Sequence, residues 1–343
     1  MMNGETRART RRRIIGAIGG GAVACALGAA ATSATPAIAA ETADAYPSKQ
    51  IRIVVPYPPG GFNDTLARTF AEHLQADWKQ SVVVDNKPGG NTLIGNGAVA
   101  NAAPDGYTLL ITPLPFAALP GLYSAKLPYD ALKSFDRVIW AGSTQNVLGL
   151  RKGFPAKNVA ELIDYAKKNP GKINFASTGS GSSNHLSMEL FMAMTGTKMV
   201  HIPYKGSAPA RTALAAGEVD VLFDNTPNLL PLVQAGRVDA IAVTSLKRSA
   251  LLPDVPTVDE SGVKGYEVDV WFGVQAPSGT PKPVIAKLNA KMVEILKTPK
   301  VVEAFRKQGV EVAASTPERF EALVRSEIEK WGKLVRDAGI RIE

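Results

Sequence analysis

Cysteine and histidine are scarce in this 343-residue chain, which contains one cysteine and three histidines. The cysteine is Cys25, and the histidines are His73, His185 and His201. A lone cysteine cannot form a disulfide within the chain, and no two histidines stand at the spacing of a metal site. We therefore expect no disulfide, no metal and no cofactor.

The motifs of nucleotide binding and of nucleophilic catalysis are also missing. The chain has no GK[ST] phosphate loop, and the stretch 179–184 lacks the third glycine of a dinucleotide-binding fingerprint. It has no G-x-S-x-G nucleophile elbow either. We assign no catalytic residue, and keep as a weaker alternative an exported serine hydrolase that uses Ser180 or Ser182 with His185.

The N-terminus has the features of an export signal. Five arginines precede a Gly/Ala-rich apolar stretch at 14–31, and an A-x-A site follows at 37–39. We predict that residues 1–39 are a cleaved signal peptide and that the protein is periplasmic. The run TRRRII at 10–15 and the weak apolarity of the stretch fit the twin-arginine route.

The composition of this segment disfavours two other interpretations. A retained membrane anchor is disfavoured by the many glycines and by the cleavage site. Lipid attachment at Cys25 is disfavoured because Ala22 stands where a larger aliphatic residue is usual. Cleavage after Ala39 would remove the only cysteine from the mature chain.

Basic charge is concentrated in this segment and nowhere else. The formal net charge is +8, and removal of five basic and one acidic residue with the signal leaves +4. The other lysines and arginines are spread along the chain, so no block is typical of a nucleic-acid interface. We expect no nucleic-acid partner.

Strand-like and helix-like runs alternate after residue 50, which is typical of an α/β protein with a mostly parallel sheet. The apolar runs 147–150 and 271–275 are candidates for paired crossover strands that form a hinge. The tail predicts a long helix that Thr316 caps and Gly339 ends. The expected division is lobe 1 at 47–147 and 272–343, and lobe 2 at 148–271.

Two glycine-rich turns each follow a predicted strand and open a predicted helix. Glycine lets backbone approach a ligand closely, and a helix N-terminus offers unpaired N–H donors and a partial positive charge. Neither turn contains lysine or arginine, so the pair predicts a neutral clamp for one small anion between two lobes. The candidate ligand-binding residues are Pro59, Gly60, Gly61, Phe62, Asn63 and Asp64 in the first turn, and Ser177, Thr178, Gly179, Ser180, Ser182, Ser183 and His185 in the second.

Asp224 is a further candidate, because it ends the apolar run 221–223, where an α/β sheet places functional side chains. The alternative is that it caps the next helix near Pro227. Direct contact with a carboxylate ligand would be repulsive, so a ligand contact would need water or a hydroxyl or amine donor. The same caution applies to Asp64.

These motifs together resemble the extracytoplasmic solute receptors of tripartite tricarboxylate transporters, the Bug (Bordetella uptake gene) family. The resemblance covers essentially the whole mature chain in order. The residues that carry it are YPSK (46–49), PYPPGG (56–61), APDGYT (103–108), LPYD (127–130), the Ser/Gly loop ending at His185, PYKG (203–206), VLFDN (221–225), AVTS (242–245), PDVPTV (253–258) and WFG (271–273).

The resemblance implies a type II periplasmic binding protein, with two α/β lobes joined by crossover hinge strands. It further implies a monomer that closes on a small carboxylate and delivers it to the membrane permease subunits of the transporter. In the family, the loops that match 59–64 and 177–185 approach the ligand from opposite lobes, and the position of Asp224 lines the second lobe. The same fold acting as a ligand sensor for a membrane kinase is the main alternative.

Two stretches depart from the family pattern. Where many relatives have a Ser/Thr/Gly-rich stretch, residues 112–119 read TPLPFAAL. If Thr112 and Phe116 line the cleft, one wall is apolar and aromatic, which favours an aromatic or apolar-bodied carboxylate over citrate. The stretch 88–95 also differs from the usual glycine arrangement, with Asn91 and Thr92 after two glycines.

Overall fold

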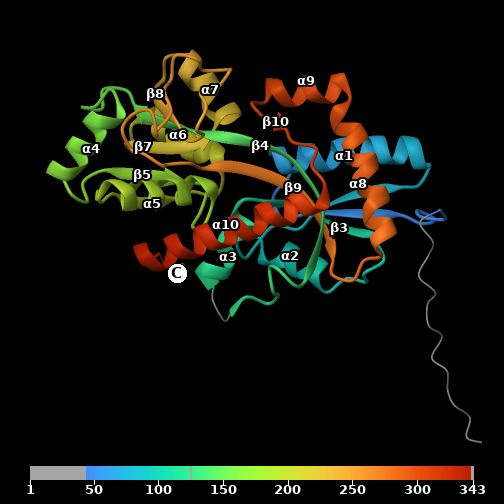
Figure 1. The fold of residues 1–343 in the computed structure, drawn as a ribbon. Helices are drawn as coiled ribbons and strands as arrows, with labels where there is room; N and C mark the ends of the chain where they lie inside the picture. The colour runs from blue at the N-terminus through green and yellow to red at the C-terminus, as the bar shows by residue number, and fades with distance from the viewer. Residues whose placement is uncertain (1–43, 124–125, 341–343) are drawn as a thin grey trace, which may run out of the picture. The chain divides into compact units, whose positions relative to one another are not determined.

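The computed structural model describes residues 44–123 and 126–340. The predicted export signal lies outside the described residues and stays a prediction. The first part of the chain alternates strands and helices as expected (Figure 1). Its elements are β1 (Ile51–Val55), α1 (Phe62–Trp78), β2 (Val82–Asn86), α2 (Leu93–Ala100), β3 (Thr108–Pro113) and α3 (Pro115–Tyr123).

A long strand, β4 (Phe135–Arg151), leads into the second series. That series comprises α4 (Val159–Lys168), β5 (Asn174–Ser177), α5 (Ser183–Thr195), β6 (Val200–Pro203), α6 (Ser207–Ala216), β7 (Val221–Asn225), α7 (Thr226–Gln234) and β8 (Val238–Val243). The tail returns through β9 (Asp269–Pro277), α8 (Lys282–Lys297), α9 (Pro299–Lys307), β10 (Glu311–Val312) and α10 (Pro317–Ala338).

The strands form one curled sheet in the order β2-β1-β3-β9-β4-β7-β5-β6, with β8 and β10 also paired to β4. Pairing is parallel within β2-β1-β3 and within β7-β5-β6, and antiparallel wherever β4 or β9 takes part. Each parallel group is the centre of one α/β lobe, and β4 and β9 run between the two groups (Figure 1). The predicted fold class is confirmed.

The two crossover strands pair at a different place from the one expected. Residues 135–145 of β4 pair with β9, from Phe135 opposite Pro277 to Gln145 opposite Asp269. The run 147–150 instead pairs with β7 and β8, inside the second lobe. Since β4 is continuous, the predicted lobe boundary after residue 147 falls within one strand, and its position stays a prediction.

The last helix, α10, is built as its sequence predicts. The Thr316 hydroxyl accepts a hydrogen bond from the Arg319 N–H, and Gly339 ends the helix in a left-handed conformation. Phe320, Val324 and Trp331 on its apolar stripe are fully buried. The helix contacts α3, β4 and α5, so one amphipathic face covers elements from both series.

Gly273 in β9 shows how closely this helix approaches the crossover strand. A Cβ atom at this position would lie 2.2 Å from the Phe320 ring and 2.8 Å from the Ile139 carbonyl oxygen. The ring of the neighbouring Trp271 packs edge-on against Phe320, with centroids 5.7 Å apart. The absence of a side chain at 273 is therefore what lets α10 pack on β9.

Within the described residues, no helix combines the length and the hydropathy needed to cross a bilayer.

Asp269, at the end of the β4–β9 pairing, makes stability depend on pH. Burial, chiefly, and the nearby carboxylates of Glu267 and Glu327 together raise its pKa to about 6. The folded protein therefore holds a proton that the unfolded chain releases near pH 4, so this group lowers stability as pH rises from about 4 to about 6.

We predict that Asp269→Asn increases the free energy of unfolding by about 1–3 kcal/mol at pH 8 and changes it little at pH 4. Urea unfolding of wild type and variant at the two pH values measures the difference. Asp254→Asn, at an exposed position, is the matched control. An equal effect of Asp269→Asn at both pH values would contradict the pKa shift.

Candidate functional site

The two glycine-rich turns lie at the carboxyl ends of parallel strands in different lobes. The first joins β1 to α1, and the second joins β5 to α5. Pro59, Gly60 and Gly61 are exposed. Gly60 has φ +95°, and a Cβ atom there would meet nothing within 4 Å, so this backbone borders open space.

The Asp64 carboxylate organises the first turn from inside. Its Oδ2 atom accepts hydrogen bonds from the Gly60 N–H at 3.1 Å and from Arg68 Nε at 2.9 Å. Its Oδ1 atom accepts from Asn86 Nδ2 at 3.1 Å, and the same amide donates to the Tyr57 carbonyl at 3.1 Å. Asp64 is thus a positioning residue whose oxygens are already occupied.

The charge of Asp64 is stabilised where it stands. Burial alone would raise its pKa, but hydrogen bonds from Arg68, Asn86 and Gly60 outweigh burial and lower it below the usual value. The carboxylate therefore remains ionised at neutral pH. Arg68 balances this charge at the base of the turn.

Free backbone donors are what the first turn offers to its surroundings. Within the described chain, the N–H groups of Gly61, Phe62 and Asn63 have no hydrogen-bond partner. They are the first donors of α1, where the helix dipole also favours negative charge. The Phe62 side chain points elsewhere, since its ring packs against Phe272 and Phe305 with centroids 4.6 and 5.0 Å away.

Buried side chains also shape the second turn. The Ser177 hydroxyl accepts the Gly179 N–H at 3.0 Å and is hydrogen-bonded to His201 Nε2 at 2.6 Å. Burial, chiefly, and the adjacent His185 ring together lower the pKa of His201 to about 4. His201 is therefore neutral at pH 7 and lies beneath the turn.

His185 is held from three sides in the first turn of α5. Its backbone N–H donates to the Ser182 hydroxyl, which caps the helix. Its Nδ1 atom accepts the Gly181 N–H at 3.2 Å, and Nε2 lies 3.3 Å from a carboxylate oxygen of Glu189. This assigns the neutral tautomer with the proton on Nε2. The ring fixes the turn rather than activating a hydroxyl.

The hydrolase alternative has no geometric support. A general base must accept a proton from its nucleophile, yet the His185 acceptor nitrogen is taken by the Gly181 N–H. The serine that does contact a histidine ring is Ser177, whose side chain is fully buried. A substrate could not reach that hydroxyl.

Asp224 lies at the carboxyl end of β7, one residue before its last, and inside the second lobe. Its Oδ1 atom accepts from Asn184 Nδ2 at 3.1 Å, from the Asn225 N–H at 2.8 Å and from Asn228 Nδ2 at 3.0 Å. The Ser207 hydroxyl donates to Oδ2. Burial raises the pKa of Asp224 even though these four hydrogen bonds lower it. Because the carboxylate is 1% exposed, the geometry favours the alternative in which Asp224 organises the start of α7.

The remaining polar side chains of the second turn are divided between framework and open surface. Thr178 donates to Asn184 Oδ1 at 2.6 Å, and Ser183 is buried. The Ser180 hydroxyl, by contrast, is partly exposed and makes no hydrogen bond within the described chain. The N–H groups of Ser183 and Asn184 likewise have no partner there. This turn therefore presents backbone donors and one free hydroxyl.

The expected apolar wall at 112–119 is not present as predicted. Residues 115–123 form helix α3 rather than a loop, and Phe116 is 1% exposed. Its ring lies among those of Tyr129 and Phe135, with the Arg137 guanidinium 5.9 Å from its centroid. Phe116 belongs to the core because α3 lies under α10. Thr112, at the end of β3, is also fully buried.

Two residues that organise the site were missed. Asn86 and Ser207 each supply a hydrogen bond that fixes a candidate carboxylate. Asn86 ends a strand and Ser207 begins a helix, which are positions where short polar side chains often bond to backbone or to neighbouring loops. Their partners are 22 and 17 residues away, so local pattern could not identify them.

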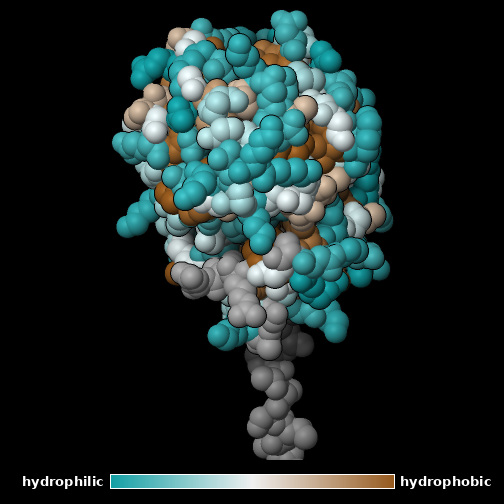
Figure 2. Space-filling model, turned by 90° about the vertical axis from the view of Figure 1, so that its left-hand side faces the viewer, coloured by the Kyte–Doolittle hydropathy of each residue, from teal (hydrophilic) through white to brown (hydrophobic). Residues whose placement is uncertain are grey.

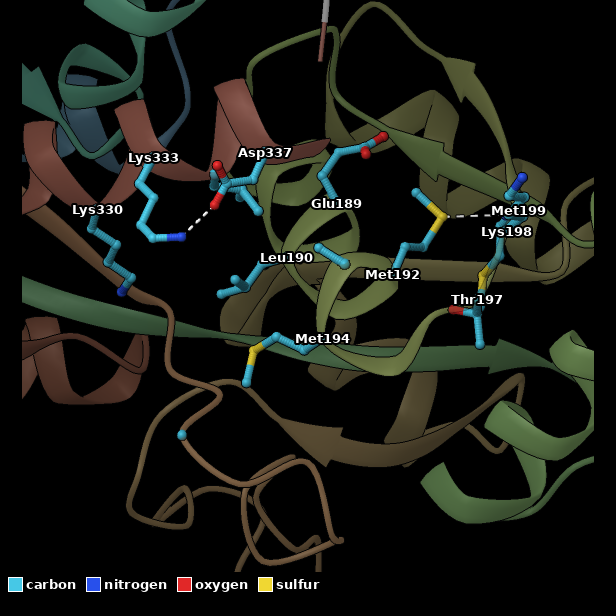
Figure 3. Close-up of a pocket in the computed structure, with 13 residues that line it drawn as sticks. Glu189, Leu190, Met192, Met194, Thr197, Lys198, Met199, Lys330, Lys333 and Asp337 are labelled. Atoms are coloured by element: carbon cyan, nitrogen blue, oxygen red, sulfur yellow. Dashed lines mark hydrogen bonds and ion pairs between the residues drawn. The ribbon is translucent and has the colours of Figure 1, made fainter. Parts of the chain in front are cut away.

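A separate groove of about 910 Å³ lies between the ends of α5 and α10 (Figure 3). Figure 3 shows Lys330 and Lys333 of α10 on one side, with Lys333 paired to Asp337, and Met192 of α5 on the other side beside Met199. None of the predicted ligand-binding residues lines it.

The surface on the side of α4 and α5 is mostly hydrophilic, with hydrophobic residues visible in several separate places (Figure 2). Scattered apolar side chains are ordinary on protein surfaces and do not mark a docking site.

Comparison with known proteins gives consistent matches. Residues 66–340 match the family described as "Tripartite tricarboxylate transporter family receptor". The chain is 38% identical over 309 residues to the "UPF0065 protein in tcbD-tcbE intergenic region" of a Pseudomonas strain, covering 90% of this chain and 92% of that protein. It is 38% identical over 312 residues to protein BugT of Bordetella pertussis, covering 90% and 96%.

Solved structures give matches that are consistent with these sequence matches. An R. palustris protein solved with adipate is 37% identical, with a TM-score of 0.79, over 87% of this chain and 100% of that chain. MatC from Rhodopseudomonas palustris, solved with malate, is 32% identical, with a TM-score of 0.77, over 84% and 100%. The periplasmic binding protein BugD is 39% identical, with a TM-score of 0.77, over 87% and 100%.

We predict that Asp64→Asn lowers the free energy of unfolding by about 1–3 kcal/mol at pH 7, because an amide cannot accept from all three donors. The folded pKa is lowered, so the wild-type advantage is complete above about pH 4 and disappears as pH falls through the folded pKa. Urea unfolding at pH 7 and pH 3 measures it.

Glu72→Gln, at an exposed position of the same helix, is the matched control. Equal stability of wild type and Asp64→Asn at pH 7 would show that the carboxylate does not hold the turn.

Proposed function

Because the chain belongs to the tripartite tricarboxylate transporter receptor family, we propose that it is a periplasmic receptor that binds a small carboxylate between its two lobes. Members of this family are solute-binding proteins and not enzymes. The neighbours solved with adipate and with malate support a carboxylate as ligand.

One observation carries the proposal for this chain: each lobe presents a helix N-terminus with unpartnered N–H groups. Those of α1 are at Gly61, Phe62 and Asn63, and those of α5 are at Ser183 and Asn184. Such groups are suited to carboxylate oxygens, because they donate hydrogen bonds and lie at the positive end of a helix. A ligand with negative oxygens at both ends would contact both sets when the lobes close.

Closure follows from this division of donors. In an open form, a ligand contacts one lobe, whereas in a closed form it contacts both. The ligand therefore binds the closed form more tightly and shifts the population toward it. The continuous strands β4 and β9 are the connection about which the lobes would move.

The part of the ligand that carries the carboxylates can also be proposed. With Phe116 in the core, the argument for an aromatic ligand loses its structural basis. A small aliphatic dicarboxylate fits the paired N-termini better, since each end of the molecule would receive backbone donors. Delivery of this ligand to membrane permease subunits, after export by the N-terminal signal, is the role that family membership supports. Sensing for a membrane kinase is the alternative.

We predict that adipate or malate raises the midpoint of thermal unfolding, because a ligand that binds only the folded state adds about 2.7 kcal/mol at a concentration 100 times its Kd. The panel comprises adipate, malate, citrate, terephthalate, nicotinate, aspartate and glutamate, each followed by calorimetry. Hexanoate is the control with one carboxylate. A panel in which no carboxylate shifts the midpoint would refute the receptor proposal.

Substitution of Ser180 in the second turn tests ligand affinity separately from the stability of the fold. We predict that Ser180→Ala weakens adipate binding about 3- to 10-fold and leaves the thermal midpoint unchanged, because this hydroxyl has no partner among residues 44–123 and 126–340. Ser182→Ala is the matched variant, and should lower the free energy of unfolding by about 1 kcal/mol through loss of the helix cap. Unchanged adipate affinity in Ser180→Ala would exclude that hydroxyl as a contact.

A further inference from the structure

The groove between α5 and α10 gathers the accessible methionines of the described chain. Met192, Met194 and Met199 line it, whereas Met188 and Met292, the other methionines of residues 44–123 and 126–340, are fully buried. Methionine is flexible and polarizable, so a surface built from it adapts to the apolar side chains of a partner. This composition is typical of a protein-binding surface.

Other apolar side chains share the same concavity. Met194 is 39% exposed, and Leu190 is half-buried on the same helix. Leu334 contributes to the groove from α10. Apolar residues elsewhere on this side of the molecule are scattered, but these are collected in one place, which is the arrangement that marks an interaction site.

The charged residues of the groove favour an acidic partner. Asp337 is paired with Lys333, and a carboxylate oxygen of Glu189 lies 3.3 Å from His185 Nε2, so both acids that line the groove are engaged. Lys198, by contrast, is exposed, and its ammonium group has no partner within residues 44–123 and 126–340. A carboxylate of a partner would therefore find an unpaired cation here.

The two walls of the groove are tied to different lobes. Helix α10 packs closely on α3 of the first series, since a Cβ atom on Gly121 would lie 3.2 Å from Gly332 Cα. Helix α5 is joined to β7 of the second series by the Asn184 amide, which donates to the Phe223 carbonyl oxygen at 2.8 Å. A movement of one lobe against the other would therefore change the width of the groove.

Helix α5 also links the groove to the second glycine-rich turn. Glu189 lines the groove and lies one helical turn from His185, which its carboxylate contacts. His185 Nδ1 accepts the Gly181 N–H at 3.2 Å. An occupant that contacts Glu189 would therefore act on the ring that fixes the turn.

We propose that this groove is the docking surface for an apolar, acidic segment of the transporter's membrane permease subunits. The inference rests on the proposed receptor function and deepens it, because it names the surface through which the ligand is delivered. Apolar side chains of the segment contact Leu190 and Met194, and one of its carboxylates pairs with Lys198. Since the groove has one wall from each lobe, its fit to the segment distinguishes the closed, loaded receptor from the open one.

The test measures uptake of adipate or malate into vesicles that contain the permease subunits, with the receptor added outside. Met194→Glu places a charge on the apolar wall, and Lys198→Glu reverses the charge that pairs with the segment. Each should raise the receptor concentration that gives half-maximal uptake about 10-fold or more. Neither residue lies in a ligand turn, so the dissociation constant for adipate or malate, measured by calorimetry, should be unchanged.

Val83→Glu and Lys300→Glu are the matched controls. Val83 is 41% exposed on β2, Lys300 is exposed at the start of α9, and neither lines the groove. These variants repeat the two chemical changes elsewhere on the surface, and they should leave the half-maximal concentration unchanged. A loss of the same size in the controls would overturn the inference, because the effect would not depend on the groove.

The outcomes separate this inference from the receptor proposal. If wild type and both groove variants drive uptake at the same receptor concentration, the inference is wrong and the receptor function stands. Should one groove variant lose ligand binding through misfolding, the other decides. If wild type binds adipate or malate but drives no uptake, docking is refuted and carboxylate binding stands. If wild type binds no member of the carboxylate panel, the receptor proposal and this inference fall together.

Discussion

The antiparallel pairing of β4 with β9 is the constraint on which the architecture depends. These two strands are the members of the sheet that run from one parallel group to the other. Their pairing extends from Phe135 opposite Pro277 to Gln145 opposite Asp269, so the connection between the lobes is a two-stranded ribbon. Helix α10 packs on this ribbon through Phe320, and the missing side chain at Gly273 makes that contact possible.

A second theme is the use of buried polar side chains to position backbone donors. Asp64, Ser177, His185 and Asp224 looked from the sequence like ligand contacts. In the structure, their polar atoms are occupied by neighbouring N–H and O–H groups. What remains for a ligand is the unpaired backbone of two helix starts and the Ser180 hydroxyl. This division suits an anion receptor, since a neutral backbone clamp can hold a carboxylate without a buried counter-ion.

The fold class, the two glycine turns and the capped final helix could be predicted from sequence because each rests on local physics. Apolar periodicity identified strands and helices, and Thr316 and Gly339 identified the ends of α10. Prediction from the sequence failed where contacts between distant residues decide the local structure. The stretch 112–119 is expected to line the cleft, yet residues 115–123 form helix α3, which packs against α10 and buries Phe116. The extent of β4 was missed for the same reason, since its partners lie more than 70 residues away.

The sequence by itself determined that this chain is an α/β protein with two anion-suited turns, because strand and helix periodicity and glycine placement are local properties. Only the tertiary structure decided which polar groups form hydrogen bonds within the described chain and which have no partner there. Hydrogen bonds such as Asn86 to Asp64 and Asn184 to Asp224 join residues far apart in the chain, and so does the core that encloses Phe116.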